Sequence, residues 1–492
     1  MVTKLFLTSA VIVSVFGSAS ANAQQDMTCK PGVTLSQKDV AELVLKQGRR
    51  TLETNLQFQG YRLALSQSLV NFQWNLLVTS GYLVDRSIGF ATPVYDKQDT
   101  LTTNVILSKN FTTGTYAGLE YKRTSFKGQP NGLGSTQGVR SVQTQDLLGL
   151  NIEQHLWADS LGSADRADVE AANLTYKAQS ILRTKSLENV VLDGIRLYWK
   201  TFVSERNFRE AVSSRDRSKK LADAVQKKSG FGYANPGELS QARADYEGRV
   251  QDVKNNSTSY LANLDALNTA LNLPQGCEIK FAVSEVIPAV PDLPEKSIDD
   301  LRAIKSQKLT ATAAERAYDS AKSKDAPTFK LVGKVYTYGV DQDGDGSYSN
   351  MASGSNPQYY AGVKLEYPFG SDYLSENRLN RKYARDLEQS RLSRLNQETQ
   401  DAVAQAQRRV KVTYSAVLSS IEQRKYRERA LQELNRSFGQ GRTDISIYIE
   451  AMNKFSASEI QYSQAIGDYQ TALNEWAASR DELIPASSEE QQ

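Results

Sequence analysis

The sequence is poor in the side chains that most metal sites and catalytic centres use. Its 492 residues include one histidine, two cysteines and four methionines, which argues against a relay of metal-binding histidines or methionines. No glycine-rich phosphate loop follows a strand pattern, and the two cysteines lie far apart in the chain. Nucleophilic, nucleotide and zinc chemistry therefore lack the residues they need, so we expect neither an enzyme nor a cofactor.

Charge of one sign is also lacking. Lysine and arginine number 59 and aspartate and glutamate 56, which gives a formal net charge of +3 at neutral pH. Because nucleic-acid-binding proteins usually carry a strong basic excess, nucleic acid is not an expected partner. The charges are mixed in sign, as on long helices exposed to solvent.

The one long apolar run lies at the N-terminus. Lys4 is followed by apolar residues 5–16 and then by small residues that end in Ala21-Asn22-Ala23. This pattern is typical of a secretory signal peptide cleaved after Ala23. The run is too short to cross a bilayer, which requires about 20 apolar residues. We expect residues 1–23 to be removed, the mature protein to be exported, and residues 485–492 to form a disordered tail.

The rest of the chain is internally duplicated. Phe231-Gly232 matches Phe438-Gly439-Gln440-Gly441, and an alanine follows ten residues after the aligned glycine in both copies. A second matched set, Gly149, Glu153, Asp159 and Leu161, recurs at Gly362, Glu366, Asp372 and Leu374. We therefore interpret residues 24–290 and 291–484 as two structural repeats.

Proline is absent where long helices are expected. None occurs between Pro130 and Pro236, so residues 159–229 can form one helix of roughly 105 Å. Each repeat should contain a short helix, strands, a long helix and a return helix. The expected strands span 72–157 and 328–369, the long helices 159–229 and 371–437, and the return helices 236–273 and 443–480, with short helices near 36–69 and 297–322.

The helix lengths also predict how the elements are arranged. In each repeat the short helix and the return helix together are about as long as the long helix. The long helix should therefore run antiparallel to two short helices stacked end to end, with the strands at one pole and the glycine turns at the other. The return helix after Gly441 has small and aromatic residues at alternating steps of four and three between Ala451 and Trp476, which is a coiled-coil pattern.

Two cysteines in an exported protein can form one disulfide, and the alternative is two unpaired thiols. Cys29 and Cys277 both flank the breaks between short helices. Because these breaks fall at the same level along the long helix, the arrangement favours the bridge.

The strand patterns are amphipathic. One face of the first strand is formed by Trp74, Leu76, Val78, Ser80 and Tyr82. Aromatic residues near strand ends, where a membrane-interface girdle would need them, are Tyr95, Tyr116 and Tyr121. One chain supplies four to six strands, too few to close a barrel, so several chains should close one together. About 40 extra residues in the first repeat should form an added hairpin or loop. The alternative is a soluble β cap.

These features together resemble the TolC-like outer-membrane efflux channel family. The resemblance covers nearly the whole mature chain, through Thr34-Leu35-Ser36, 149–161, 232–242, 362–370 and 441–451. It implies a mainly α fold with a β-hairpin membrane region, in which a duplicated coiled-coil tunnel continues into a β-barrel shared by a trimer. The family has a proline before each long helix, which Pro368 preserves and His155 does not.

The resemblance also implies a function. Such a homotrimer sits in outer-membrane lipid with its helices in the periplasm, and it serves a tripartite efflux or type I secretion system as a passive exit duct. A periplasmic adaptor and an inner-membrane pump would be its partners. The competing interpretation is an envelope-spanning coiled-coil structural protein that does not conduct.

Acidic residues after the glycine turns are placed by the resemblance at the periplasmic mouth. Glu450 matches the innermost acid, Glu238 corresponds to it in the first repeat, and Asp444 is either a third gate residue or a helix N-cap. The turns at Gly232 and Gly441 would loosen when the gate opens. Three copies of Glu450 would favour cations. The alternative is an ordinary solvated helix face.

A segment between the last two strands resembles the start of a calcium loop. Asp341, Asp343 and Asp345 have the spacing of the first three ligands, but Ala352 replaces the closing acid. We expect no flanking helix. A polar hairpin tip is therefore the favoured interpretation, with calcium as a weak candidate and no other metal site.

Overall fold

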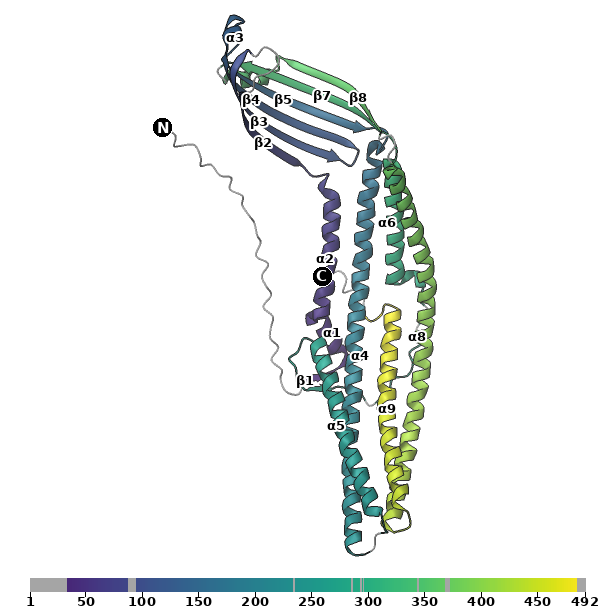
Figure 1. Cartoon of the computed structure of the whole chain (residues 1–492). Helices are drawn as coiled ribbons and strands as arrows, with labels where there is room; N and C mark the ends of the chain where they lie inside the picture. Colours follow the sequence, from purple (N-terminus) through teal and green to yellow (C-terminus); the bar gives the residue numbers. More distant parts are fainter. Residues whose placement is uncertain are drawn as a thin grey trace, which may run out of the picture.

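The structure is a computed structural model that describes residues 33–86, 94–232, 235–284, 286–292, 294, 296–342, 345–367 and 372–484. The chain is elongated, with a β-sheet at one end and long helices extending from it (Figure 1). The expected signal peptide and the expected tail both lie outside the described residues. No helix within them is long and apolar enough to cross a membrane.

Two long helices set the length of the molecule. They are α4 (Ser163–Gly230) and α8 (Tyr373–Gly439), with 68 and 67 residues. Each is about 100 Å long. The shorter helices α2 (Arg49–Val70) and α5 (Glu238–Ala270) pack along α4, whereas α6 (Arg302–Lys324) and α9 (Ile445–Ser479) pack along α8. This is the duplicated, mainly α arrangement predicted from the sequence.

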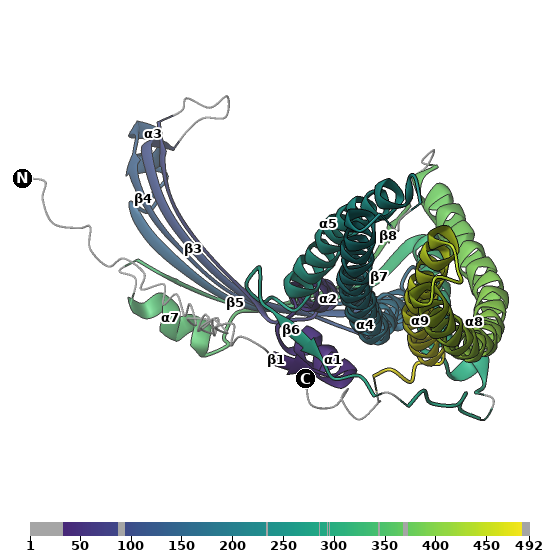
Figure 2. The same cartoon turned by 90° about the horizontal axis from the view of Figure 1, so that it is seen from below.

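The helices form one curved layer. Because α4 also packs against α6 and α9, the order is α2, α4, α6, α8 near the sheet and α5, α4, α9, α8 farther away. Seen from below, α5, α4, α9 and α8 follow one another along an arc, and α1 lies on one side of it (Figure 2).

The first short helix is not continuous, which corrects the expectation for residues 36–69. It consists of α1 (Gln37–Gln47) and α2, separated by Gly48. Gly48 has an extended backbone (φ −61°, ψ 131°), which ends α1, and α2 starts directly after it. The Gly48 amide still donates to the Val44 carbonyl. Ser36 is the N-cap as expected, in a capping box with Asp39.

Helix starts elsewhere also differ from expectation. The return helix α5 begins at Glu238 rather than at Pro236, because its N-cap Gly237 has a φ of 89°, outside the helical region. At the joint where His155 replaces the family proline, the Asp159 carboxylate accepts the amides of Ala164 (2.7 Å) and Asp165 (3.0 Å) at the start of α4. A side-chain cap thus starts this long helix.

The large sheet has six antiparallel strands within the described residues. Their spatial order follows the chain order, β2-β3-β4-β5-β7-β8. They are β2 (Asn75–Asp85), β3 (Tyr95–Phe111), β4 (Thr115–Pro130), β5 (Val142–His155), β7 (Thr328–Asp341) and β8 (Pro357–Glu366). The first repeat contributes four strands and the second two. The surplus residues of the first repeat therefore form an added hairpin.

A small domain lies midway along α4. Here β1 (Val33–Leu35) pairs in parallel with β6 (Ile279–Phe281), and α1 packs on α4 around the fully buried Tyr198, whose hydroxyl donates to the Leu35 carbonyl (3.1 Å). Cys277 is buried in this region and bonded as a disulfide. Its expected partner Cys29 lies outside the described residues, so the pairing itself stays a prediction.

A buried ionic cluster joins the two repeats near the end of α9. Lys185 of α4 contacts both Glu188 and Asp481 at 2.8 Å, and the Arg302 amide donates to Asp481 at 2.5 Å. Burial raises the pKa of Glu188. Burial also acts to raise the pKa of Asp481, but hydrogen bonds from Lys185 and the Arg302 amide outweigh it and lower that pKa. The cluster fixes the segment directly after α9 to α4 and α6.

Candidate functional site

One face of the large sheet is mainly apolar, and the other carries most of its charged side chains together with the exposed Leu77 and Leu83 of β2. Successive side chains of a strand alternate between faces, and the strand registers show which residues share one. The apolar face contains Leu76, Val78, Tyr82, Val84, Leu101, Val105, Leu107, Ala117, Leu119, Leu148, Leu150, Ile152, Leu331, Val335, Tyr359, Ala361, Val363 and Leu365. Many of these side chains are exposed, for example Leu76 (63%) and Val363 (65%). An exposed apolar surface this wide marks contact with lipid or with a partner.

The charged side chains of the central sheet lie on the opposite face. They are Glu120, Lys122, Glu153, Lys330, Lys334, Lys364 and Glu366. Glu153 and Lys330 form an ion pair there (3.5 Å). Apolar-out, polar-in alternation is the pattern of strands in a transmembrane β-barrel.

The apolar band crosses the sheet diagonally. One row of directly paired residues runs from Leu76 through Leu107, Leu119, Leu150 and Val335 to Tyr359. In β2 the centre of the band lies near residue 80, four residues from Leu76 on the side away from the helices. In β8 it lies near residue 362, three residues from Tyr359 on the side toward the helices. From β2 to β8 the centre of the band thus moves toward the helices by about 1.4 residues per strand. With ~3.3 Å per residue and ~4.8 Å between strands, this shift means that the strands are tilted by roughly 44° from the direction perpendicular to the band. Barrel strands have tilts near this value.

Polar groups and aromatic rings border the band. At the end far from the helices, Arg86 pairs with Asp99 (2.9 Å) and Arg123 approaches Asp146 (3.9 Å). At the near end, the Lys109 ammonium lies over the rings of Trp74 (5.3 Å) and Phe111 (5.2 Å), and Trp157 is also exposed. Such a border of aromatic and charged side chains suits a membrane interface.

The girdle residues expected from the sequence are partly wrong. Tyr116 lies on the polar face, because it pairs with Glu153 in the register. The hydroxyl of Tyr121 donates to Asp146 (2.8 Å) on the apolar side, and that of Tyr95 donates to the Arg140 carbonyl (2.8 Å) at the far tip. Because a shift of one residue moves a strand side chain to the opposite face of the sheet, the presence of aromatic residues near strand ends did not predict the face on which each tyrosine lies.

The candidate calcium segment carries a helix, which corrects the expectation that no helix flanks it. The helix is α7 (Asp345–Ala352), and its Ser347 hydroxyl donates to the buried Asp146 on the apolar side of the sheet (2.5 Å). Asp341 accepts the Gly346 amide (3.0 Å), and Asp343 lies outside the described residues. Within those residues no group of three or more acidic, histidine or cysteine side chains could hold a metal ion.

The two glycine turns have the same geometry at the pole opposite the sheet. Gly232 and Gly441 have φ values of 78° and 71°, a left-handed conformation that glycine adopts without strain. The amide of each bonds to a carbonyl three residues back, in both cases at 3.0 Å. Beneath them Val225, Ala242, Phe438 and Ile449 are buried in a shared core of the four helices.

The three candidate gate carboxylates have separate local partners. Glu450 is exposed and ion-paired with Lys454 one turn later, whose hydrogen bond lowers the pKa of Glu450. Glu238 accepts from the Asn235 amide group (2.6 Å). Asp444 is the N-cap of α9, accepting the Ser446 amide (2.8 Å), and this serine lowers the pKa of Asp444. One chain does not gather the three into a cluster, and their gate role stays a prediction.

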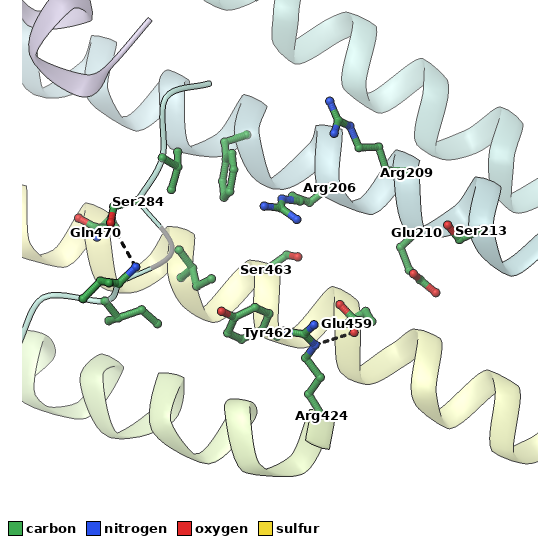
Figure 3. Close-up of a pocket in the computed structure, with 15 residues that line it drawn as sticks. Arg206, Arg209, Glu210, Ser213, Ser284, Arg424, Glu459, Tyr462, Ser463 and Gln470 are labelled. Carbon is green, nitrogen blue, oxygen red and sulfur yellow. Dashed lines mark hydrogen bonds and ion pairs between the residues drawn. The ribbon is translucent and has the colours of Figure 1, made fainter. Parts of the chain in front are cut away.

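A cavity of about 510 Å³ lies between α4, α8, α9 and the segment around Ser284 (Figure 3). Its lining is largely polar. Arg424 of α8 contacts Glu459 of α9 at 2.6 Å, and Glu210 of α4 accepts the Ser456 hydroxyl at 2.9 Å. Sequence reasoning did not identify this cavity, because residues from four distant segments form it.

The chain has the fold of the TolC-like outer-membrane channels. No known protein-family profile matches the sequence, and no curated protein sequence matches it. Among solved structures, it is similar to the CmeC outer-membrane channel of Campylobacter jejuni, with a TM-score of 0.68 and 13% identity over 92% of this chain and 86% of that one. CusC gives a TM-score of 0.68 and 14% identity over 92% and 95%. The open-state MtrE outer-membrane channel of Neisseria gonorrhoeae gives 0.64 and 14% over 93% and 94%.

Proposed function

We propose that the protein is the outer-membrane exit duct of a tripartite efflux or type I secretion system. Its sheet would span the outer membrane and its helices would extend into the periplasm. The observation that carries the proposal is the diagonal apolar band on a sheet whose other face is charged. A soluble β cap would have no reason to expose this band to water.

Homotrimer formation is supported by two open edges. Within the described residues, β2 has β3 as its only strand neighbour and β8 has only β7. The helices α2 and α8 lie at the same two edges, because α2 leads into β2 and α8 follows β8. Exposed apolar side chains follow α2 at Leu52, Leu56 and Leu63 and occur on α8 at Tyr383 and Leu387.

Joining these edges head to tail would close a ring. The contact between the α2–β2 edge of one copy and the α8–β8 edge of the next is heterologous. Such contacts form a closed ring when the rotation that relates one copy to the next divides a full turn evenly. Pairing β2 with β8 also removes the unpaired strand edges that promote aggregation. The channel fold implies three copies.

In this proposal the duct is passive. The pump in the inner membrane supplies the energy, and a periplasmic adaptor joins it to the pole that carries Gly232 and Gly441. The gate opens when these turns loosen, and Glu450 from three chains forms a ring that favours cations.

Cell fractionation separates this function from the structural alternative. We expect heat-modifiable trimers in the outer-membrane fraction. Recovery of the protein only from the soluble periplasm would refute the proposal.

The gate is tested by Glu450→Gln in planar bilayers. We expect reduced cation selectivity, because three negative charges are removed from the mouth. Asp468→Asn, an exposed acid roughly 27 Å farther along α9, is the matched control and should leave selectivity unchanged. Equal selectivity of both variants and the unaltered protein would remove the gate assignment but not the channel.

A further inference from the structure

The added hairpin changes the expected width of the pore. We propose that three copies build an 18-stranded barrel whose lumen, roughly 28 Å wide, admits cargo about 20 Å across that a 12-stranded barrel would exclude. The inference rests on the proposed trimeric channel. Its new content is the strand number and the class of cargo that follows from it.

The hairpin formed by β3 and β4 is a full part of the sheet. The match of Gly149 with Gly362 relates β5 to β8, and β2 and β7 are the first strands after the short helices α2 and α6, which leaves β3 and β4 without counterparts in the second repeat. They have 17 and 16 residues and pair with each other along their length, with β2 on one side and β5 on the other. Their apolar residues Leu107 and Leu119 continue the band of the neighbouring strands. A hairpin folded away from the membrane would not share this band.

The number of strands per chain also allows the copies to join. Six is even, so β8 of one copy and β2 of the next run antiparallel, as every other pair in the sheet does. Three chains then give 18 strands, within the even-numbered series of bacterial barrels.

Width follows from strand spacing and tilt. Eighteen strands about 4.8 Å apart and tilted by about 44° have a circumference of roughly 120 Å and a backbone diameter of roughly 38 Å. Twelve strands, one hairpin per repeat, would give roughly 25 Å at the same tilt. After about 5 Å of side chain on each side, the lumina are roughly 28 and 15 Å wide, so only the wider one admits a solute about 20 Å across.

The helical tunnel matches the wider barrel. At each level one chain contributes four helices to the layer, for example α2, α4, α6 and α8. Twelve helices about 9.5 Å apart have a circumference of roughly 114 Å, close to that of 18 strands. The passage from helices to strands then needs no narrowing.

The helix α7 does not enter this lumen. It packs at Asp146 and Gly339, which belong to the apolar, outward side of the sheet. The inward face instead carries the interspersed lysines and glutamates described above, which keep the passage hydrated.

The register across the subunit contact can be derived from the band. If the centre of the band shifts by the same ~1.4 residues between β8 of one copy and β2 of the next as it does between neighbouring strands of one chain, Val363 lies opposite Ser80 of the next copy. With cysteines at both positions (Ser80→Cys with Val363→Cys), mild oxidation should crosslink different chains and give covalent trimers. The control pair Ser80→Cys with Thr103→Cys joins residues directly paired within one chain and should give monomers. A crosslink of the first pair within one chain would overturn the proposed contact.

Single-particle reconstruction of the full-length protein in lipid nanodiscs counts the strands. We expect 18 in a trimer. A trimeric channel with twelve strands, and with the β3–β4 hairpin outside the barrel, would overturn the inference and leave the proposed function intact. Absence of a shared barrel would refute both.

The width has a separate test in planar bilayers. Polyethylene glycol with a hydrodynamic diameter of about 20 Å, added on the barrel side only, should enter the lumen of an 18-stranded barrel and lower the single-channel conductance. Full exclusion of this polymer would contradict the inferred cargo class.

Discussion

Replacing one apolar residue of the sheet by arginine tests whether the band faces lipid. Leu119 lies at the centre of the sheet, paired with Leu107 and Leu150, and its side chain is 46% exposed. In a bilayer, an arginine on the lipid face near the midplane costs about 2–4 kcal/mol. Leu119→Arg should therefore destabilise the barrel by about 2–4 kcal/mol per chain, or about 6–12 kcal/mol per trimer.

The neighbouring residue provides a control with the same new side chain. Glu120 lies on the charged face, so Glu120→Arg should change stability by less than about 1 kcal/mol. Urea unfolding of protein folded into lipid vesicles, followed by tryptophan fluorescence, measures both variants against the unaltered chain.

The alternative of a soluble β cap predicts a different outcome. In water, replacing an exposed leucine by arginine changes stability by only about 0.5 kcal/mol in either direction. Equal, small effects of Leu119→Arg and Glu120→Arg would therefore refute the assignment of this face to lipid.

Three further predictions concern other parts of the chain. Gly339→Ala places a Cβ 1.7 Å from a carbonyl oxygen of α7, so α7 should leave the sheet and be cut first in limited proteolysis; unchanged resistance would contradict this packing. Lys185→Met removes the cation that Glu188 and Asp481 share, although the Arg302 guanidinium stays 3.7 Å from Glu188 and the Arg302 amide stays bonded to Asp481. The variant should therefore cost about 3 kcal/mol, the lower end for a broken buried pair, in urea denaturation followed by circular dichroism, whereas a loss under about 1 kcal/mol would show that the cluster does not join the repeats. The pKa of Asp444 is lower in the folded protein than its ordinary value of 3.8, so the cap contributes its full stability to α9 at pH values above 3.8 and loses it as the pH falls through the folded-state pKa. NMR should show the first turn of α9 fraying only in that acidic range. Asp444→Ser, which keeps a capping oxygen, should abolish the pH dependence.

The long helices and the duplication could be predicted because their signals are local. Proline-free runs and two glycine turns followed by an alanine at the same spacing are visible in the sequence, and both turns have the left-handed conformation that glycine permits. The surplus of residues in the first repeat likewise predicted an added hairpin or loop.

Features that depend on distant residues could not be predicted. A glycine inside a helical pattern is tolerated as often as it breaks the helix, so the extended backbone at Gly48 has no local signal. The position of α7 depends on Asp146, about 200 residues away, which accepts the Ser347 hydroxyl. The face of Tyr116 is set by the register with β5, which the sequence of one strand does not contain.

Single-channel recording of the purified full-length protein tests the central claim most directly. The account predicts that trimers reconstituted in planar bilayers give discrete, cation-selective conductance steps. Folded trimers that insert into the bilayer yet give no conductance above that of the protein-free membrane would contradict it.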